Sequence, residues 1–154
     1  MPFTTEVALR LIAATLIGSG VGLDRELRHK PAGLKTHALV ALGASLVTAV
    51  CAFLPDSTAM SRAIQGIIAG VGFLGGGAIL KSNDEMVHGL TTAASIWLVA
   101  SLGIACGAGQ WIIAIIALLI ALLILVVGNA VETRLRRRLL RKREVTGVST
   151  GHED

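Results

Sequence analysis

Long apolar runs separated by short polar turns follow one another along the 154 residues of this chain. Each run is close to the roughly 20 residues that a helix needs to cross a hydrocarbon core of about 30 Å. Lipid offers no partner to unpaired backbone groups, so runs of this length are expected to be helices. The pattern predicts an all-α membrane protein with five transmembrane helices, over residues 5–23, 34–54, 63–80, 89–106 and 111–128.

The composition agrees with this prediction. The chain is 53% hydrophobic and only 16% charged, whereas soluble domains average about 25% charged residues. We therefore expect a transmembrane domain over residues 1–130 and a basic cytoplasmic tail over residues 131–154.

The first four runs form two copies of one pattern. Each copy has a glycine-rich apolar stretch, a charged turn, a Gly-Leu-x-Thr sequence and a second apolar stretch. The glycine stretches begin at Gly18 and Gly75, and the Gly-Leu-x-Thr sequences begin at Gly33 and Gly89. A single gap in the turn aligns the two copies, and internal repetition of this kind fixes the architecture. The repeat predicts two parallel helical hairpins followed by a fifth helix.

The basic residues predict the orientation, because Lys and Arg are concentrated on the cytoplasmic side of membrane proteins. The turn after the first run holds Arg25, Arg28, Lys30 and Lys35, and the tail holds the largest cluster. Placing this turn and the tail inside requires a periplasmic amino terminus and a cytoplasmic carboxyl terminus.

The tail is predicted to continue the fifth helix and to contact anionic lipid, because its basic residues directly follow an apolar run. Nucleic acid is not favoured as a partner, since the tail has no aromatic residues for base stacking. The lipid-binding candidates are Arg134, Arg136, Arg137, Arg138, Arg141, Lys142 and Arg143.

Glycines are the expected means of helix packing. Small residues four apart let helix backbones approach closely in lipid, and packing inside the bundle is favoured over dimerisation. The candidates are Gly18, Gly22, Gly70, Gly72, Gly75 and Gly76, and the pairs Gly66/Gly70 and Gly103/Gly107 have the same spacing.

Most candidate chemistry lies in the two turns predicted to be cytoplasmic. One holds Asp24, Arg25 and Glu26, and the other holds Asp84, Glu85 and His88. Solvated ion pairs are one interpretation, in which Arg25 pairs with a carboxylate of its own turn or of the other repeat. A weak Mg²⁺ site is the other, because hard cations prefer carboxylate oxygens, although the basic neighbours argue against tight binding. As helix-end residues, Asp24 and Arg25 are expected to tolerate neutralisation at ~0–1 kcal/mol.

Four polar residues, Thr36, His37, Thr91 and Thr92, lie about one turn inside their predicted helices. Polar groups at that depth usually form hydrogen bonds within the bundle. His37 could instead titrate, because histidine changes charge near neutral pH.

Together these segments resemble the MgtC/SapB family of membrane proteins. The resemblance covers residues 5–128. It rests on Gly22-Leu23-Asp24-Arg25-Glu26, Lys30-Pro31-Ala32-Gly33-Leu34-Lys35-Thr36-His37, Gly72-Phe73-Leu74-Gly75-Gly76-Gly77 and His88-Gly89-Leu90-Thr91-Thr92-Ala93-Ala94. Asp24 stands where many members carry Glu. The functional motif implied is Asp24, Arg25, Glu26, Pro31, Gly33, Thr36, His37, Gly89, Thr91 and Thr92.

The resemblance implies a bacterial inner-membrane protein tied to growth in low magnesium and to virulence. It would be a non-enzymatic regulator of other membrane proteins, among them the F-type ATP synthase, with no cofactor. The sequence shows no nucleophile–base pair, metal triad or phosphate loop, which disfavours an enzyme. A small magnesium or cation transporter is the alternative, and homo-oligomerisation is left open.

Overall fold

The computed structural model describes residues 2–56, 58–80 and 88–146, and the side-chain environments of 4–56, 58–79, 88–131, 133 and 134. These residues form five helices, and all five are long and apolar enough to cross a membrane, as predicted. They are α1 (Pro2–Leu27), α2 (Leu34–Cys51), α3 (Ala59–Leu80), α4 (Leu90–Gly107) and α5 (Trp111–Thr146).

The helix α5 continues past its predicted span to Thr146, as expected of the tail. The other helix ends differ from the predicted ends by a few residues, because local capping decides them. The helix α1 runs past the charged triplet to Leu27 and ends in a Schellman motif, in which the backbone turns through a left-handed residue. That residue is His29, with φ 54°. The helix α2 ends at Cys51, with Ala52 as its C-cap. Pro55 keeps the helix from reaching its predicted end at Leu54, because a proline disfavours helical conformation in the residue that precedes it.

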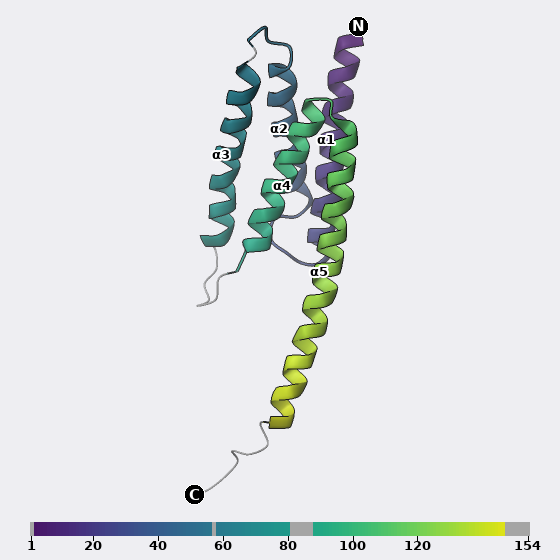
Figure 1. Cartoon of the computed structure of the whole chain (residues 1–154), viewed down its shortest axis with the longest axis vertical. Coiled ribbons are helices and arrows are strands. Elements are labelled where there is room, and N and C mark those ends of the chain that lie inside the picture. The colour runs from purple at the N-terminus through teal and green to yellow at the C-terminus, as the bar shows by residue number, and fades with distance from the viewer. Residues whose placement is uncertain (1, 57, 81–87, 147–154) are drawn as a thin grey trace, which may run out of the picture. The chain divides into compact units, whose positions relative to one another are not determined.

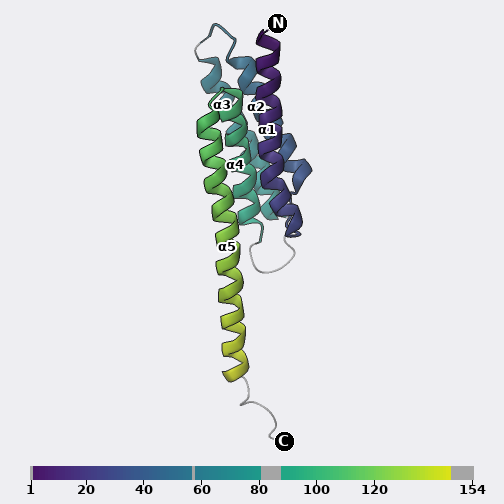
Figure 2. The ribbon, with the colours of Figure 1, turned by 90° about the vertical axis from the view of Figure 1, so that its right-hand side faces the viewer.

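The chain divides into two units, residues 1–118 and 119–154, which are described separately. In the first unit α1 and α2 form one hairpin and α3 and α4 form the other. Figure 1 shows α1 and α3 running in the same direction, so both hairpins turn at the same end of this unit. The helix α4 packs against α1, α2 and α3, and Figure 2 shows α1 and α4 side by side.

Small residues fill the interior of this unit. Ala14, Ala41, Ala49, Val99 and Ala100 are buried. Larger apolar side chains such as Leu16 and Leu39 lie outside, each 67% exposed. This distribution suits lipid, because association of helices in a membrane depends on close packing rather than on removing apolar surface from water.

Two glycine pairs bring α2 against its neighbours. A β-carbon at Gly18 would lie 2.6 Å from the His37 carbonyl oxygen, and one at Gly22 would lie 2.7 Å from the Leu34 Cα. On the other side of α2, the Cβ position of Gly103 meets the Ala41 carbonyl oxygen, and that of Gly107 lies 2.5 Å from the Ser45 carbonyl oxygen. Any larger residue would push the backbones apart at these four positions.

The second hairpin repeats one of these contacts. Gly75 of α3 lies against Ala93 of α4, with 3.5 Å between its Cβ position and the Ala93 β-carbon. In a sequence alignment of the two repeats, Gly75 corresponds to Gly18 and Ala93 corresponds to His37. The same packing contact therefore recurs with a histidine in the first hairpin and an alanine in the second.

The prediction that Gly70, Gly72 and Gly76 pack inside the bundle is wrong. A β-carbon at any of these positions would have nothing within 4 Å, and Gly70 and Gly72 are exposed. Gly66 is equally open. The spacing of glycines identifies a face that a helix can approach, but not whether a helix of the same chain lies there.

Candidate functional site

The consecutive charged residues Asp24, Arg25 and Glu26 make three different contacts at the end of α1. Asp24 Oδ1 accepts a hydrogen bond from Arg28 Nε at 2.9 Å, within the same helix. Glu26 Oε2 accepts the Leu34 N–H at 2.8 Å and so caps the first turn of α2. Arg25 turns into the bundle. The triplet therefore connects α1 to two other helices.

Arg25 is 3% exposed, and its Nη2 donates to the hydroxyl of Thr92 in α4. This hydrogen bond joins the first hairpin to the second. Arg25 Nε has no hydrogen-bond partner among the described residues. Within those residues the contact of Arg25 in the other repeat is a hydroxyl, not the carboxylate that the sequence suggested.

His37 forms a second link between the hairpins. Its side chain is fully buried. The imidazole Nε2 lies 3.0 Å from Ser95 Oγ, and Nδ1 lies 3.0 Å from the Gly33 carbonyl oxygen. Ser95 Oγ also lies 2.8 Å from the Thr92 carbonyl oxygen. Thr92 and Ser95 are one turn apart on α4, so Arg25 and His37 contact the same helical turn.

The proton positions in this cluster follow from the acceptors. Gly33 offers a carbonyl, which can only accept, so Nδ1 of a neutral His37 carries the proton. Nε2 must then accept from Ser95, whose single hydroxyl proton is shared between His37 and the Thr92 carbonyl. Ser95 was not among the sequence-predicted residues. Its position three residues after Thr92 was the available signal.

The turn of the first hairpin is held closely against α1. A β-carbon at Gly33 would lie 2.5 Å from Glu26 Oε2, so a larger residue would displace the carboxylate that caps α2. Pro31 is exposed, and Ala32 has a φ of 57°. Gly89 begins α4 with a φ of 91° and its Cβ position lies 2.6 Å from the Ala78 carbonyl oxygen. Gly89 is therefore required by its conformation and by the backbone of α3, whereas Gly33 makes room for the Glu26 cap.

Thr36 and Thr92 occupy aligned positions in the repeat but different environments. Thr92 is buried and Thr36 is exposed. Thr36 and Pro31 line two cavities, one of about 700 Å³ over the first turn and one of about 740 Å³ between the hairpins. Thr91 is exposed beside them. The structure thus gathers Pro31, Thr36, Gly89 and Thr92 at one end of the first unit.

Some predicted residues cannot be placed. Asp84 and Glu85 lie outside the described residues. The side chains of Arg136, Arg137, Arg138, Arg141, Lys142 and Arg143 lie outside them as well. Arg134 is described and is exposed. In the parts of the chain that the structure describes, no three His, Cys, Asp or Glu side chains gather as a metal site would require.

Arg10 forms a separate polar contact near the opposite end of α1. An arginine near a helix end usually reaches water, yet the side chain of Arg10 is only 12% exposed. Its Nη1 donates to the Gly107 carbonyl at 2.8 Å, and Nη2 pairs with Glu6. The guanidinium also lies 5.9 Å from the centre of the Phe53 ring. Arg10 therefore fastens α1 to the end of α4.

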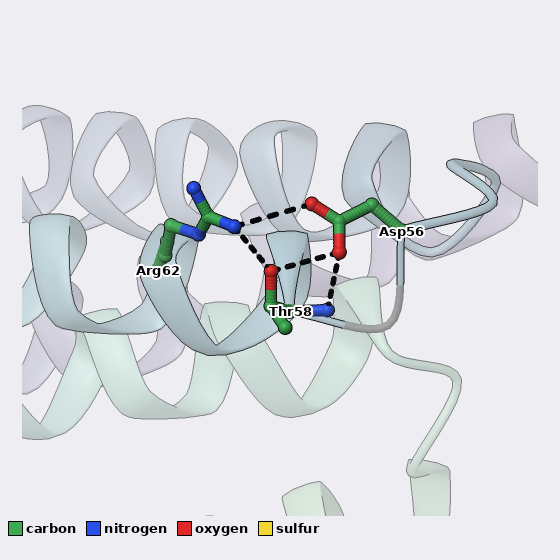
Figure 3. A network of polar contacts seen from close by, with 3 residues as sticks. All are labelled: Asp56, Thr58 and Arg62. Carbon is green, nitrogen blue, oxygen red and sulfur yellow. Dashed lines mark hydrogen bonds and ion pairs between the residues drawn. The ribbon is translucent and has the colours of Figure 1, made fainter.

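Figure 3 shows the network at the start of α3, in which Asp56 and Thr58 lie outside the membrane-spanning segment and Arg62 lies in its first turn. Asp56 Oδ1 accepts the backbone N–H of Thr58 at 2.8 Å and its hydroxyl at 2.7 Å. Arg62 Nη2 donates to Thr58 Oγ1 and lies 3.4 Å from Asp56 Oδ2. The hydroxyl and then the N–H of Thr58 lower the pKa of Asp56 below its ordinary value. The carboxylate thus stabilises the first turn of α3.

Comparison with known proteins identifies the family of this chain. Residues 11–134 match the model of the MgtC family. The chain belongs to the MgtC family. The matched residues include the whole Arg25–Thr92 and His37–Ser95 cluster, so the inter-hairpin contacts lie within the family domain.

Three relatives illustrate the range of this MgtC family. Protein SrpB of Synechococcus elongatus is 42% identical over 77% of this chain and 72% of its own length. The "Putative magnesium transporter YhiD" of Escherichia coli K12 is 36% identical over 88% of this chain and 66% of its own length. Protein MgtC of Salmonella typhimurium LT2 is 42% identical over 74% of this chain, which covers 48% of that protein. No solved structure matches the chain.

Proposed function

We propose that this chain is a non-enzymatic regulator of other membrane proteins, and that the open face of α3 binds a transmembrane helix of its target. The observation that carries the proposal is the state of the Gly66/Gly70 pair. Both glycines are exposed and a β-carbon at either would meet nothing within 4 Å. The face is therefore smooth enough for a second helix to approach closely.

The contrast with the other glycine pairs supports an external partner. Gly18/Gly22 and Gly103/Gly107 have the same spacing and are both covered by the backbone of α2. In this chain a covered pair marks a helix–helix contact. The uncovered pair on α3 offers the same contact to a helix from outside the described residues.

The identity of the partner is part of the proposal. The resemblance makes the F-type ATP synthase the first candidate to test, and a second copy of this chain is the other. Regulation of such a target would connect the protein to growth in low magnesium and to virulence. One relative is named as a putative magnesium transporter, and the names of SrpB and MgtC state no activity.

Magnesium transport is the second candidate function, supported by the name of the relative YhiD. The two functions make opposite predictions in proteoliposomes. A regulator reconstituted alone gives no magnesium flux, whereas a transporter gives flux that saturates with magnesium concentration.

The decisive experiment combines complementation with crosslinking. A strain lacking this protein is grown in low magnesium and supplied with the wild type, Gly70→Leu or Gly43→Leu. Gly43 is the matched control, because it is an equally open glycine on α2. We expect Gly70→Leu to lose rescue at unchanged protein level and Gly43→Leu to retain it.

A photocrosslinking residue at position 70 or 43 then identifies the contact. The proposal expects position 70, and not position 43, to crosslink to an ATP synthase subunit or another membrane protein. Full rescue by Gly70→Leu would contradict it, and so would equal crosslinking from both positions.

The proposed location is the bacterial inner membrane, with the amino terminus periplasmic and the carboxyl terminus cytoplasmic. The basic residues of the first turn and of the tail support this orientation. A reporter fused after Arg143 should be active in the cytoplasm. Periplasmic activity at that position would contradict the proposed orientation.

A further inference from the structure

The cavity of about 740 Å³ lies where the two hairpins face each other. Its walls come from the first turn, from α2, from the end of α3 and from the start of α4. One side is apolar and includes Phe73 and Leu74 of α3, which are 84% and 48% exposed. The other side carries the hydroxyl groups of Thr36 and Thr92 and the imidazole of His88. The cavity is therefore amphipathic and its apolar edge reaches the surface that faces lipid.

One buried positive charge lies behind the polar side of this cavity. Arg25 lies directly behind Thr92, to which it donates a hydrogen bond. It is 3% exposed and makes no close ion pair among the described residues, although the neighbouring Asp24 carboxylate acts on it electrostatically. Its Nε is buried and has no hydrogen-bond partner among those residues. Burial of a cation in this way is unfavourable, so an anion bound at the Thr92 wall would stabilise it.

The start of α4 adds to this potential. The helix begins at Leu90, and its N-cap, Gly89, lines the cavity and offers no side-chain cap. The N–H groups of a first helical turn carry partial positive charge and bind anions. The first turn of α2, in contrast, is already capped by Glu26. The anion-binding helix end at this cavity is thus that of α4.

The neighbouring cavity extends the basic surface toward water. It shares Pro31 and Thr36 with the first cavity and is also lined by Lys30 and Lys35. Glu26 lines it too, with Oε2 occupied by the Leu34 N–H. Two lysines against one carboxylate leave this rim positive. A ligand with an anionic head and an apolar chain would match both cavities.

The geometry points to a binding site for one anionic phospholipid between the hairpins, with its phosphate near Thr92, Thr36 and the start of α4 and an acyl chain along Phe73 and Leu74. The proposal does not depend on the docking of a partner at Gly66 and Gly70. It concerns a specific site in the first unit, distinct from the basic tail.

Gly77 provides the test. It lines the cavity, and a β-carbon there would meet nothing within 4 Å. Gly77→Leu should therefore occupy space needed by the lipid while leaving the helix intact, since leucine favours a helix more than glycine does. Gly70→Leu is the matched control, because it adds the same group to an open position of α3 that does not line the cavity.

The full-length protein is purified in detergent and titrated with palmitoyl-oleoyl phosphatidylglycerol or the corresponding phosphatidylcholine, and bound lipid is counted by native mass spectrometry. We expect the wild type and Gly70→Leu to retain one phosphatidylglycerol more tightly than phosphatidylcholine. Gly77→Leu should bind it about tenfold more weakly. The tail is identical in all three proteins, so lipid bound there does not contribute to the difference.

Equal retention of phosphatidylglycerol by Gly77→Leu and Gly70→Leu would overturn the proposal. Equal affinity for the two lipids would overturn its charge argument, and the double substitution Lys30→Gln, Lys35→Gln should reduce the preference for phosphatidylglycerol. Competition by millimolar inorganic phosphate without any tightly held lipid would show a free-anion site instead. Loss of rescue by Gly70→Leu concerns only the partner site, so the two proposals can fail separately.

Discussion

Arg25, near the end of α1, donates a hydrogen bond to the hydroxyl of Thr92, in the first turn of α4. The two residues are 3% and 2% exposed and belong to different repeats. Together with His37 and Ser95 they hold the two hairpins in register at the end where both turn. A helix-end arginine is usually a surface residue, whereas this one is part of the interior.

Thr92→Val should therefore destabilise the protein. The change leaves a buried charged donor without its acceptor, which costs about 1–3 kcal/mol. Thr91→Val is the matched control, because Thr91 is exposed and should change stability little. Thermal unfolding in detergent measures both. Unfolding midpoints that fall equally for the two variants would contradict the role of this hydrogen bond.

Because Arg25 is buried, neutralising it should not have the same effect as neutralising its neighbour Asp24. Arg25→Gln is now expected to lower stability, because Arg25 is not a solvated helix-end residue. Asp24→Asn should have the smaller effect, because its ion pair with Arg28 is partly exposed, with 36% of the Arg28 side chain and 17% of the Asp24 side chain accessible. The amounts of folded protein in membranes are compared for the two variants. Equal amounts would contradict the buried role of Arg25.

Two glycine substitutions should now have opposite effects. Gly22→Leu places atoms against the Leu34 Cα, 2.7 Å from the first added carbon, and overfilling of this kind typically costs about 1–3 kcal/mol. Gly76→Leu meets nothing within 4 Å and should be neutral or stabilising, because leucine favours a helix. Thermal stability in detergent distinguishes them. A large loss with Gly76→Leu would show that its face is covered.

The fold could be predicted from the sequence because each apolar run is long enough to span the membrane and the repeat fixes the direction of the hairpins. Helix ends were less predictable, because they depend on capping. The bonds of Asp56 with Thr58 begin α3 at Ala59, four residues before its apolar run. His29 in the left-handed conformation ends α1 after the charged triplet.

The motif residues could be named from the sequence, but their pairing could not. The Arg25–Thr92 contact depends on the register of α1 against α4, which no local pattern encodes. The glycines show the same limit, because Gly18/Gly22 and Gly66/Gly70 have identical spacing and opposite surroundings. Arg10 turns inward because it donates a hydrogen bond to the carbonyl group of Gly107. That acceptor lies far away in the sequence, so no pattern near Arg10 predicts it.

Backbone conformation makes a further pair of substitutions informative. Gly109 has a φ of 75° and its Cβ position lies 3.0 Å from Arg10 Nη2. Gly109→Ala should therefore cost about 1–2 kcal/mol from the left-handed conformation alone. Gly20→Ala lies in an open part of α1 and should stabilise by about 0.5–1 kcal/mol. If the unfolding midpoints of the two variants shift in the same direction, the backbone conformation of Gly109 does not have the expected effect on stability.

The final prediction concerns acid stability at the start of α3. Thr58 lowers the pKa of Asp56 through two hydrogen bonds, first from its hydroxyl and then from its N–H. A carboxyl group whose pKa is lower in the folded state stabilises the fold above its unfolded pKa of about 3.9. That contribution is lost as the pH falls through the folded pKa. The wild type should thus be more stable than Asp56→Asn at neutral pH, and the difference should disappear under acid conditions.

Asparagine is the suitable control, because its side-chain oxygen can still accept the Thr58 N–H while carrying no charge. Unfolding of both proteins in detergent, from neutral pH to about pH 2, measures the difference. A constant difference over this range would show that the charge of Asp56 contributes nothing, and that α3 begins at Ala59 through hydrogen bonding alone.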